Sequence, residues 1–185
     1  MTEREKMLKG MLYDANNDKL LIKERIECKE LCYDYNHLRP NDESRRKELL
    51  FRILGKVAGE ILIEQPFYCD YGCNISVGHN FYANYNLVIL DEAEVTFGDN
   101  IYIAPNCSFF TAEHPIKAEV RNCGLETARP IKVGNDVWFG GGVIVLPGVT
   151  IGDNCVIGAG SVVTRDIPSD SVAVGNPCRV IKNIK

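Results

Sequence analysis

Residues 131–167 read IKVGNDVWFGGGVIVLPGVTIGDNCVIGAGSVVTRDI, and an apolar residue recurs there at every sixth position. This first column comprises Val133, Phe139, Val145, Ile151, Ile157 and Val163. A second column, two residues earlier, stays small or aliphatic: Ile131, Val137, Val143, Val149, Cys155, Ser161 and Ile167. Because alternate strand residues face opposite sides, each six-residue unit predicts a short strand with both columns inward, followed by a corner.

The same interval continues upstream of this stretch. Val95, Phe97, Ile101, Ile103, Cys107 and Phe109 keep the frame, as do Ile75, Val77, Phe81, Ala83, Leu87 and Ile89 once two extra residues near 91–94 are allowed. Three units of about eighteen residues close one coil, so the repeat predicts roughly fourteen units in roughly five coils. Stacked coils bury a continuous apolar core. An antiparallel sandwich would explain the alternation but not the fixed interval of six.

Glycine is concentrated in residues 131–167, which hold eight of the sixteen glycines of the chain. Several follow the first column directly, as Gly134, Gly140 and Gly152 do. Glycine at these positions predicts the corners where the chain turns. The frame places four residues with useful chemistry on the outside of the coils: Asp70, Asn84, Trp138 and Thr164.

The N-terminal third has a different character. Basic and acidic residues alternate there, and apolar residues follow helical spacing around Cys28 to Tyr35 and around Leu49 to Val57. Asn41 or Asp42 is a suitable N-cap for the second run. We expect a small helical cap over residues 1–58 and a repeat domain over residues 59–185. Within that domain, residues 111–130 break the repeat as a long loop, and residues 168–185 form a tail.

Composition excludes several classes of protein. The chain has 185 residues and a formal net charge of -4, and no apolar run is long enough to span a membrane. Without a signal peptide we expect a cytoplasmic protein with thiol cysteines. Three residues separate Cys28 from Cys32 and Cys69 from Cys73, unlike the two-residue spacing of zinc and redox motifs, so no metal is expected. Balanced charges in the cap argue against a nucleic-acid partner.

Several motifs, in order, resemble those of the maltose and galactoside O-acetyltransferases of the hexapeptide-repeat superfamily, and the resemblance covers nearly the whole chain. They are Gly10-Met-Leu-Tyr-Asp14, Asn80-Phe-Tyr-Ala-Asn84-Tyr-Asn86, Gly98-Asp-Asn100, Ile103-Ala-Pro105-Asn106, His114-Pro115, Val137-Trp138, Pro147-Gly-Val-Thr-Ile-Gly152 and Gly175-Asn-Pro-Cys-Arg179. The resemblance implies a mainly β protein, a left-handed parallel β-helix of hexapeptide repeats with a small N-terminal helical cap. It also implies a homotrimer with active sites between subunits.

The activity that the resemblance implies is transfer of an acetyl group from acetyl-CoA to a sugar hydroxyl, such as one of maltose, glucose or a galactoside. The acceptor hydroxyl must lose its proton as it attacks the thioester, and an imidazole is the usual base at neutral pH. The histidine of the family that matches His114 serves as this base. His37 lies in the helical cap without such a context.

Positions that bind the acceptor in the family match Asp14, Asp70, Asn84 and Glu92. Carboxylates and amides suit a sugar, whose hydroxyls need oriented donors and acceptors. Relatives often carry Asp or Ser where this chain has Glu92 and Asp70, which leaves the preferred sugar open. Asp14 has a structural alternative, because an acidic residue before Ala-Asn-Asn also favours a turn.

Acetyl-CoA is expected along the outside of the coils. The small residues Gly141 and Ala159 would let the pantetheine arm approach the backbone, with Gly141 donating to the thioester oxygen. Other expected contacts are Thr164, Arg165, Arg179 and Lys182, because residues 161–185 carry four basic and two acidic residues and the nucleotide end is anionic. Trp138, outward and aromatic, is expected at a subunit interface that forms a wall of the active site.

Two other classes of function compete with this interpretation, and the acceptor has an alternative of its own. A γ-type carbonic anhydrase shares the repeat but needs three histidines on zinc, and position 119, where the third is expected, is Glu119. A non-catalytic hexapeptide protein would not explain His114-Pro115, Trp138 and the basic tail together. Within the enzymes, the acceptor could instead be serine, an antibiotic or a lipo-oligosaccharide, although residues 1–57 resemble the cap of the sugar enzymes.

Overall fold

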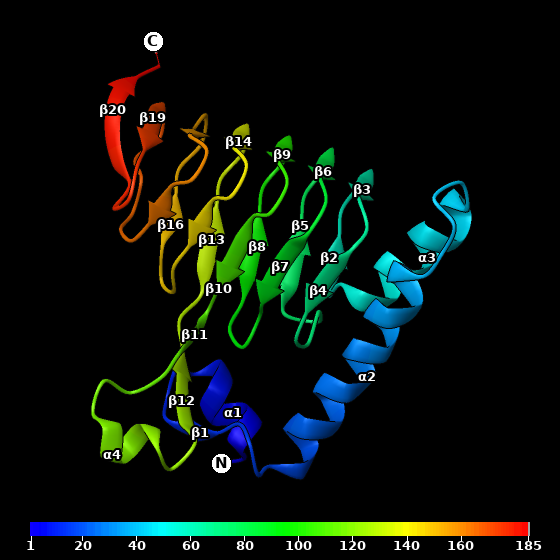
Figure 1. Cartoon of the computed structure of the whole chain (residues 1–185), viewed down its shortest axis with the longest axis vertical. Coiled ribbons are helices and arrows are strands. Elements are labelled where there is room, and N and C mark those ends of the chain that lie inside the picture. The colour runs from blue at the N-terminus through cyan, green and yellow to red at the C-terminus, as the bar shows by residue number, and fades with distance from the viewer. Residues whose placement is uncertain (185) are drawn as a thin grey trace.

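The computed structural model describes residues 1–184. The chain folds into a stack of β-coils with helices along one end (Figure 1). Most of the strands are only two to four residues long and pair in parallel, as the repeat predicts. The expected mainly β architecture with an N-terminal helical region is therefore confirmed. Within the described residues, no helix combines the length and hydropathy needed to cross a bilayer.

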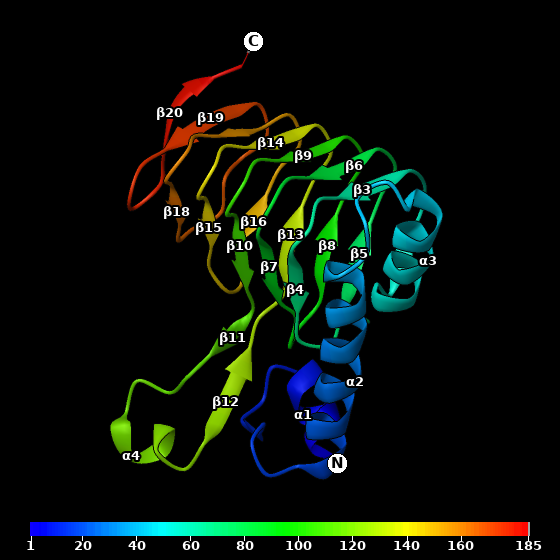
Figure 2. The same ribbon diagram turned by 45° about the vertical axis from the view of Figure 1, so that its right-hand side comes forward.

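Three sheets run along the stack, one on each side of the coils (Figures 1 and 2). The first contains β2 (Lys56–Val57), β5 (Ile75–Val77), β8 (Val95–Phe97), β13 (Ile131–Val133) and β16 (Thr150–Ile151). The second contains β3 (Ile61–Ile63), β6 (Phe81–Ala83), β9 (Ile101–Ile103), β14 (Val137–Phe139), β17 (Val156–Ile157), β19 (Ser171–Val174) and the antiparallel β20 (Arg179–Asn183). The third contains β4 (Phe67–Cys69), β7 (Leu87–Leu90), β10 (Ser108–Phe110), β15 (Ile144–Val145) and β18 (Val162–Val163). Successive triplets from β2 to β18 make five coils, and β19 begins a sixth turn.

The core consists of the two columns that the sequence places inward. Both columns are buried over residues 131–167, and Ser161 is tolerated because its hydroxyl donates to the Gly158 carbonyl at 2.6 Å. Four phenylalanines stack edge to face through successive coils with centroids 5.0 to 5.2 Å apart: Phe81, Phe97, Phe109 and Phe139. Such pairs add about 0.5–1.5 kcal/mol each beyond burial.

The corners between the first and second sheets show why glycine recurs there. A Cβ at Gly134 would lie 2.8 Å from the backbone nitrogen of Asp153 in the next coil, so close stacking excludes a side chain. The positive φ angle falls two residues later, on Asp136, at 58°. Asn100 Nδ2 donates to Asp136 Oδ1 at 2.8 Å, linking one coil to the next. Glycine therefore marks these corners through close packing, while asparagine and aspartate supply the left-handed turn.

Three helices precede the coils: α1 (Glu3–Leu8), α2 (Lys19–Asn36) and α3 (Glu43–Ile53). Each begins at a capping side chain, and Asp42, one of the two candidates from the sequence, caps α3 by accepting from Arg45 N at 3.2 Å. Helix α3 ends earlier than its apolar spacing predicts, because Val57 lies in β2. Helices α2 and α3 cover the end of the stack formed by β2, β3 and β4 (Figure 1).

The segment that interrupts the repeat, residues 111–130, is an arm with its own secondary structure rather than an unstructured loop. It contains β11 (Ala112–Glu113), α4 (Ala118–Arg121) and β12 (Leu125–Ala128), and it extends away from the coils (Figure 2). Strand β12 pairs with β11 and also, antiparallel, with β1 (Tyr13–Asp14) from the N-terminal region. The sequence missed this sheet because its β1–β12 pair joins residues more than a hundred positions apart, and its strands are only two to four residues long.

Candidate active site

His114 directly follows β11, at the base of the arm. The Arg129 guanidinium braces this position with two hydrogen bonds to the Glu113 carboxylate, at 2.6 and 2.7 Å. Paired N–H donors fix both distance and orientation. The His114 side chain is 56% exposed, so its imidazole is accessible to a substrate.

Glu126 is a neighbour of His114 that sequence reasoning missed. Its Oε1 atom lies 3.9 Å from His114 Nε2, and its Oε2 atom accepts a hydrogen bond from the Tyr13 hydroxyl at 3.0 Å. Tyr13 is fully buried and lies opposite Glu126 in the β1–β12 pair. The carboxylate is therefore fixed beside the imidazole, where it would stabilise the protonated ring. No sequence spacing indicates this contact, since it depends on the pairing of β1 with β12.

Glu92 and Asp70, expected from the sequence to bind the acceptor, lie together where β7 and β4 end. Glu92 is 5% exposed, and its Oε2 accepts from the Thr111 hydroxyl at 3.3 Å. Burial raises the pKa of Glu92 to about 9, with the neighbouring Asp70 carboxyl as the next cause. Asp70 also faces Lys29, with Nζ 3.7 Å from its Oδ1. At neutral pH Glu92 therefore keeps its proton and can donate a hydrogen bond, beside the Asp70–Lys29 ion pair.

Asp91 holds the backbone of this corner. Its Oδ1 accepts from the backbone N–H groups of Asp70 at 3.1 Å and Tyr71 at 2.8 Å, and its Oδ2 from that of Asn74 at 3.3 Å. The residue is completely buried, and burial raises its pKa to about 7 although these donors lower it. The two residues that the repeat gains near positions 91–94 thus include a buried carboxyl group that holds the backbone around Asp70 by hydrogen bonds.

Arg25 on α2 ties the helical region to the same corner. Its Nη1 donates to the Tyr71 hydroxyl at 2.8 Å and its Nη2 to the Ala15 carbonyl at 2.6 Å. Asp14, in β1 beside Tyr13, accepts from the Asn16 and Asn17 backbone N–H groups at 3.1 and 3.0 Å. The Asn17 amide also holds the pKa of Asp14 below its ordinary value. The structure therefore shows the turn that the sequence offered as an alternative role for Asp14.

Asn84 and Trp138 line a cavity that includes none of His114, Asp70 and Glu92. They share a space of about 250 Å³ on the outer face of β6, β9 and β14 with Tyr82, Tyr102 and Ala104. Trp138 is 55% exposed in the middle of β14, as its outward position in the repeat predicts. One chain thus carries the predicted acceptor residues on two separate surfaces.

The residues expected to contact acetyl-CoA lie along the outside of the coils. Gly141 and Ala159 stack at the corner between the second and third sheets, where the Gly160 N–H donates to the Gly141 carbonyl at 2.8 Å. Thr164 and Arg165 follow β18 at the next corner, and both are exposed. Arg179 and Lys182 are exposed on β20, which pairs with β19. These side chains lie on two corners and the C-terminal hairpin rather than in one pocket.

The three-histidine zinc site of the carbonic-anhydrase alternative is not assembled. His79 is exposed at a corner after Gly78, whereas His114 is on the arm. Across residues 1–184, no histidine belongs to a group of three or more potential metal ligands.

Two family models match the chain. One describes the maltose acetyltransferase hexapeptide capping motif and covers residues 6–59. The other describes the bacterial transferase hexapeptide, in six repeats, and covers residues 130–165. The first match falls on the helical region and the second on the stretch with the strict six-residue interval.

Whole-chain comparisons agree with these models. The chain is 48% identical to galactoside O-acetyltransferase of Escherichia coli over 164 residues, which is 89% of this chain and 81% of that protein. A crystal structure of a maltose O-acetyltransferase from Clostridium difficile is 54% identical, with a TM-score of 0.98 and coverage of 100% of this chain and 98% of that one. A galactoside acetyltransferase in complex with coenzyme A is 44% identical, with a TM-score of 0.96 and coverage of 100% and 92%. The chain therefore belongs to the maltose and galactoside O-acetyltransferase family, with its cap and its hexapeptide repeats.

Proposed function

We propose that this protein transfers the acetyl group of acetyl-CoA to a hydroxyl of a sugar, with His114 as the general base. The observation that carries the proposal is the accessible His114 imidazole, placed 3.9 Å from a fixed carboxylate in a chain of this family. The names of the relatives support maltose and galactosides as the first acceptors to examine.

In this mechanism His114 Nε2 takes the proton of the acceptor hydroxyl while the hydroxyl oxygen attacks the thioester carbon. The Glu126 carboxylate stabilises the imidazolium that forms, and the Tyr13 hydroxyl keeps that carboxylate in place. When the carbon–sulfur bond breaks, the imidazolium returns the proton to the departing CoA sulfur. A general base of this kind contributes about 10²- to 10⁴-fold in rate.

The acceptor would be held by Asp70 and Glu92 from the coils and by Asp14 from β1. Because burial keeps Glu92 protonated at neutral pH, its hydroxyl can donate to a sugar oxygen while Asp70 accepts from a sugar hydroxyl. This complementary pair suits a polyol better than an apolar acceptor.

Acetyl-CoA would bind outside the coils with its pantetheine arm along the corner of Gly141 and Ala159. The Gly141 backbone N–H would donate to the oxyanion of the tetrahedral intermediate, a contribution of about 3 kcal/mol in other acyl-transfer enzymes. Thr164 would hydrogen-bond the pantetheine group of acetyl-CoA. Arg165, Arg179 and Lys182 would contact the phosphates at its nucleotide end. The exposure of these side chains on the outer surface supports this placement.

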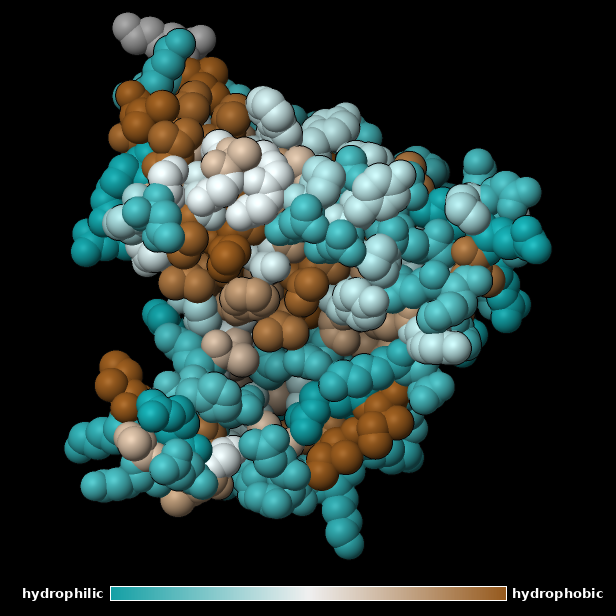
Figure 3. Space-filling model, in the orientation of Figure 1, coloured by the Kyte–Doolittle hydropathy of each residue, from teal (hydrophilic) through white to brown (hydrophobic). Residues whose placement is uncertain are grey.

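We further propose that the active protein is a homotrimer with sites between subunits. The separation of Asn84 and Trp138 from the His114 group in one chain supports it, because a neighbouring subunit could bring the two surfaces together. An exposed tryptophan and Tyr102, which is 46% exposed, on one sheet face are typical of an interface. Apolar side chains also gather where β20 ends the stack (Figure 3), including Ile181, which is 63% exposed.

The experiment is a panel of acceptors assayed for release of free CoA thiol from acetyl-CoA. Maltose, glucose and a galactoside should each be compared with serine as a non-sugar acceptor. Thiol release above the rate in buffer with at least one sugar supports the proposal, and product mass should rise by one acetyl group. Thiol release with serine alone would indicate a non-sugar acceptor. Thiol release with none of the acceptors would overturn the proposed acetyltransferase activity.

A further inference from the structure

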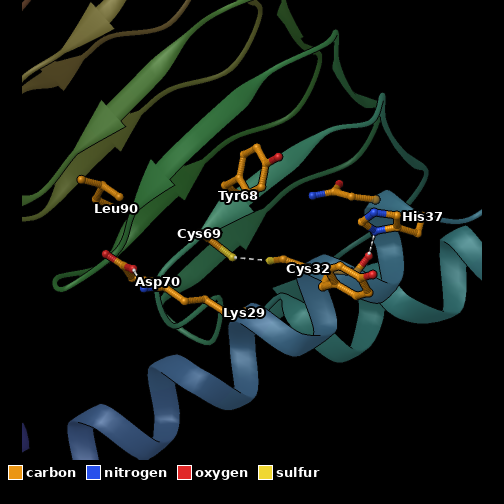
Figure 4. A pocket seen from close by; sticks show the side chains of 9 residues that line it. Lys29, Cys32, His37, Tyr68, Cys69, Asp70 and Leu90 are labelled. Atoms are coloured by element: carbon orange, nitrogen blue, oxygen red, sulfur yellow. Dashed lines mark hydrogen bonds and ion pairs between the residues drawn. The ribbon is translucent and has the colours of Figure 1, made fainter.

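Three cysteines from two separate elements converge between the cap and the coils. Cys28 and Cys32 lie one turn apart on α2, and Cys69 is the last residue of β4. Cys69 Sγ lies 3.5 Å from Cys28 Sγ and 3.7 Å from Cys32 Sγ, and all three sulfurs lie within 4.8 Å of one another. Each residue is no more than 4% exposed, and each is a free cysteine. Figure 4 shows Cys32 and Cys69 pointing toward each other across this junction.

The junction is held in place by contacts other than the sulfurs. Asn36 Nδ2 donates to the Phe67 carbonyl at 2.9 Å, and the Phe67 N–H donates to Asn36 Oδ1 at 2.8 Å. These paired bonds fix the helix against the strand two residues before Cys69. The sulfur triangle is therefore built before any ligand enters, which lowers the cost of binding.

Two sides of the sulfur triangle match the spacing in a thiolate metal centre, and the third is no longer than 4.8 Å. Sulfurs that bind Zn²⁺ at about 2.3 Å in tetrahedral geometry lie about 3.8 Å apart. The observed separations of 3.5 and 3.7 Å are within a few tenths of an ångström of that value. Buried cysteines also occur as ordinary small apolar residues. Simple packing, however, does not require three sulfurs from two elements to meet at one point.

Access and charge indicate the kind of ion. Cys32 and Cys69 also line a cavity of about 340 Å³, together with Tyr68, Leu90 and the Lys29–Asp70 pair (Figure 4). An ion can enter through this cavity, and a water molecule in it can serve as fourth ligand. Three thiolates with Zn²⁺ carry one net negative charge, whereas three with Cu⁺ carry two, and a buried charge is costly. The Lys29 ammonium at the cavity is already paired with Asp70, so the smaller net charge of the zinc form is what favours Zn²⁺.

We propose that Cys28, Cys32 and Cys69 form a zinc site with three thiolate ligands and a fourth position that opens to this cavity. Binding displaces the three thiol protons to solvent and involves no oxidant or reductant. The proposal departs from the expectation of no metal, which considered only local spacing. The third ligand, Cys69, is far from Cys28 and Cys32 in sequence. Cys73, the cysteine nearest to Cys69 along the chain, is exposed and lies outside the group.

The test uses the full-length protein, stripped with a chelator and kept reduced, and titrated with Co²⁺ and Zn²⁺. We expect one ion per chain, a near-ultraviolet sulfur-to-cobalt absorption band, and loss of that band when Zn²⁺ displaces Co²⁺. Cys32→Ser and Cys69→Ser should each weaken Zn²⁺ binding by at least about 100-fold, since losing even a group that only hydrogen-bonds a metal ligand costs 10- to 100-fold. Cys73→Ser and Cys123→Ser, at exposed cysteines, are the matched controls and should bind like the unmodified protein.

A second measurement needs no variant. Zn²⁺ should slow alkylation of Cys28, Cys32 and Cys69 in the unmodified protein, as read by peptide mass spectrometry, and leave Cys73 and Cys123 unprotected. The proposal is overturned if no ion binds at micromolar concentration, if the cobalt band lacks thiolate character, or if protection is equal at all five cysteines. These readouts do not depend on acetyl transfer, so they stand or fall separately from the proposed function.

Discussion

His114 Nε2 lies 3.9 Å from Glu126 Oε1, and this relationship joins the two sides of the arm at the candidate active site. The distance is too long for a hydrogen bond but short enough for the carboxylate to attract the positive charge that the ring would gain when it takes the acceptor proton. The arm brings the two side chains together because β12 pairs with both β11 and β1.

Replacing the proposed base should nearly abolish turnover. His114→Ala should lower kcat by about 10²- to 10⁴-fold, because no other group takes the acceptor proton, and should leave acetyl-CoA binding intact. Steady-state kinetics and calorimetry with CoA measure the two effects. His79→Ala, at an exposed corner, is the matched control. Near-normal turnover by His114→Ala would remove the general-base assignment.

Glu126 should act on kcat through His114 rather than on CoA binding. We expect Glu126→Gln to lower kcat by about five- to tenfold without changing KM for acetyl-CoA, the size expected for one partly buried ion pair. Tyr13→Phe should give a smaller loss in the same direction, because it frees the carboxylate without removing its charge. A matching loss of stability, measured by thermal unfolding, would indicate a structural role instead of a positioning one.

Glu92 should make stability fall as pH rises. Its folded-state pKa, about 9, is above that of the unfolded chain, so its contribution is complete below about pH 4.5 and is lost progressively toward pH 9. Glu92→Gln should therefore raise the midpoint of thermal unfolding relative to the unmodified protein more at pH 8 than at pH 5. The expected difference is at least about 2–4 °C, equivalent to about 1 kcal/mol. Glu30→Gln, at an exposed helical site, should show no such difference, and a pH-independent effect at Glu92 would contradict the prediction.

Because the coils approach closely at Gly134, adding one methyl group there should greatly lower the free energy of unfolding. Gly134→Ala places a Cβ 2.8 Å from a backbone nitrogen and should destabilise the protein by about 1–3 kcal/mol. Gly141→Ala is the matched control for stability, because its Cβ would meet only the Pro105 carbonyl oxygen at 3.4 Å. Urea unfolding of both variants measures the difference. Equal stability would show that neighbouring coils can move apart at Gly134.

The proposed trimer predicts a solution mass of about 62 kDa, three times the 20.7 kDa of one chain. Trp138→Glu should shift the protein toward monomer and lower activity, because it places a charge in an apolar interface. Light scattering coupled to gel filtration gives the mass, and thiol release gives the activity. A fully active 20.7 kDa species would refute a site shared between subunits.

Much of the architecture was predictable because a six-residue interval leaves few solutions. The inward columns proved buried, and Trp138 proved exposed, since a strand two or three residues long has only two faces. His114 is proposed as the base from its motif alone. The sequence does not indicate Glu126, because its position beside His114 depends on a sheet that joins residues 13–14 to residues 125–126. Residues 111–130 were expected to be a loop because the repeat signal ends there, and short strands that pair with distant partners leave little periodicity.

By itself, the sequence determined the repeat, the helical region, the family and the proposed base, because each is encoded in residues close together along the chain. Only the tertiary structure decided that Glu92 is buried beside Asp70, that Glu126 lies next to His114, and that Cys28, Cys32 and Cys69 meet at one point. These contacts join residues 12 to 41 positions apart, and the place of Glu126 also depends on β1, more than a hundred positions away. Their distances are set by how the helices and the arm pack on the coils, and local spacing carries no record of that packing.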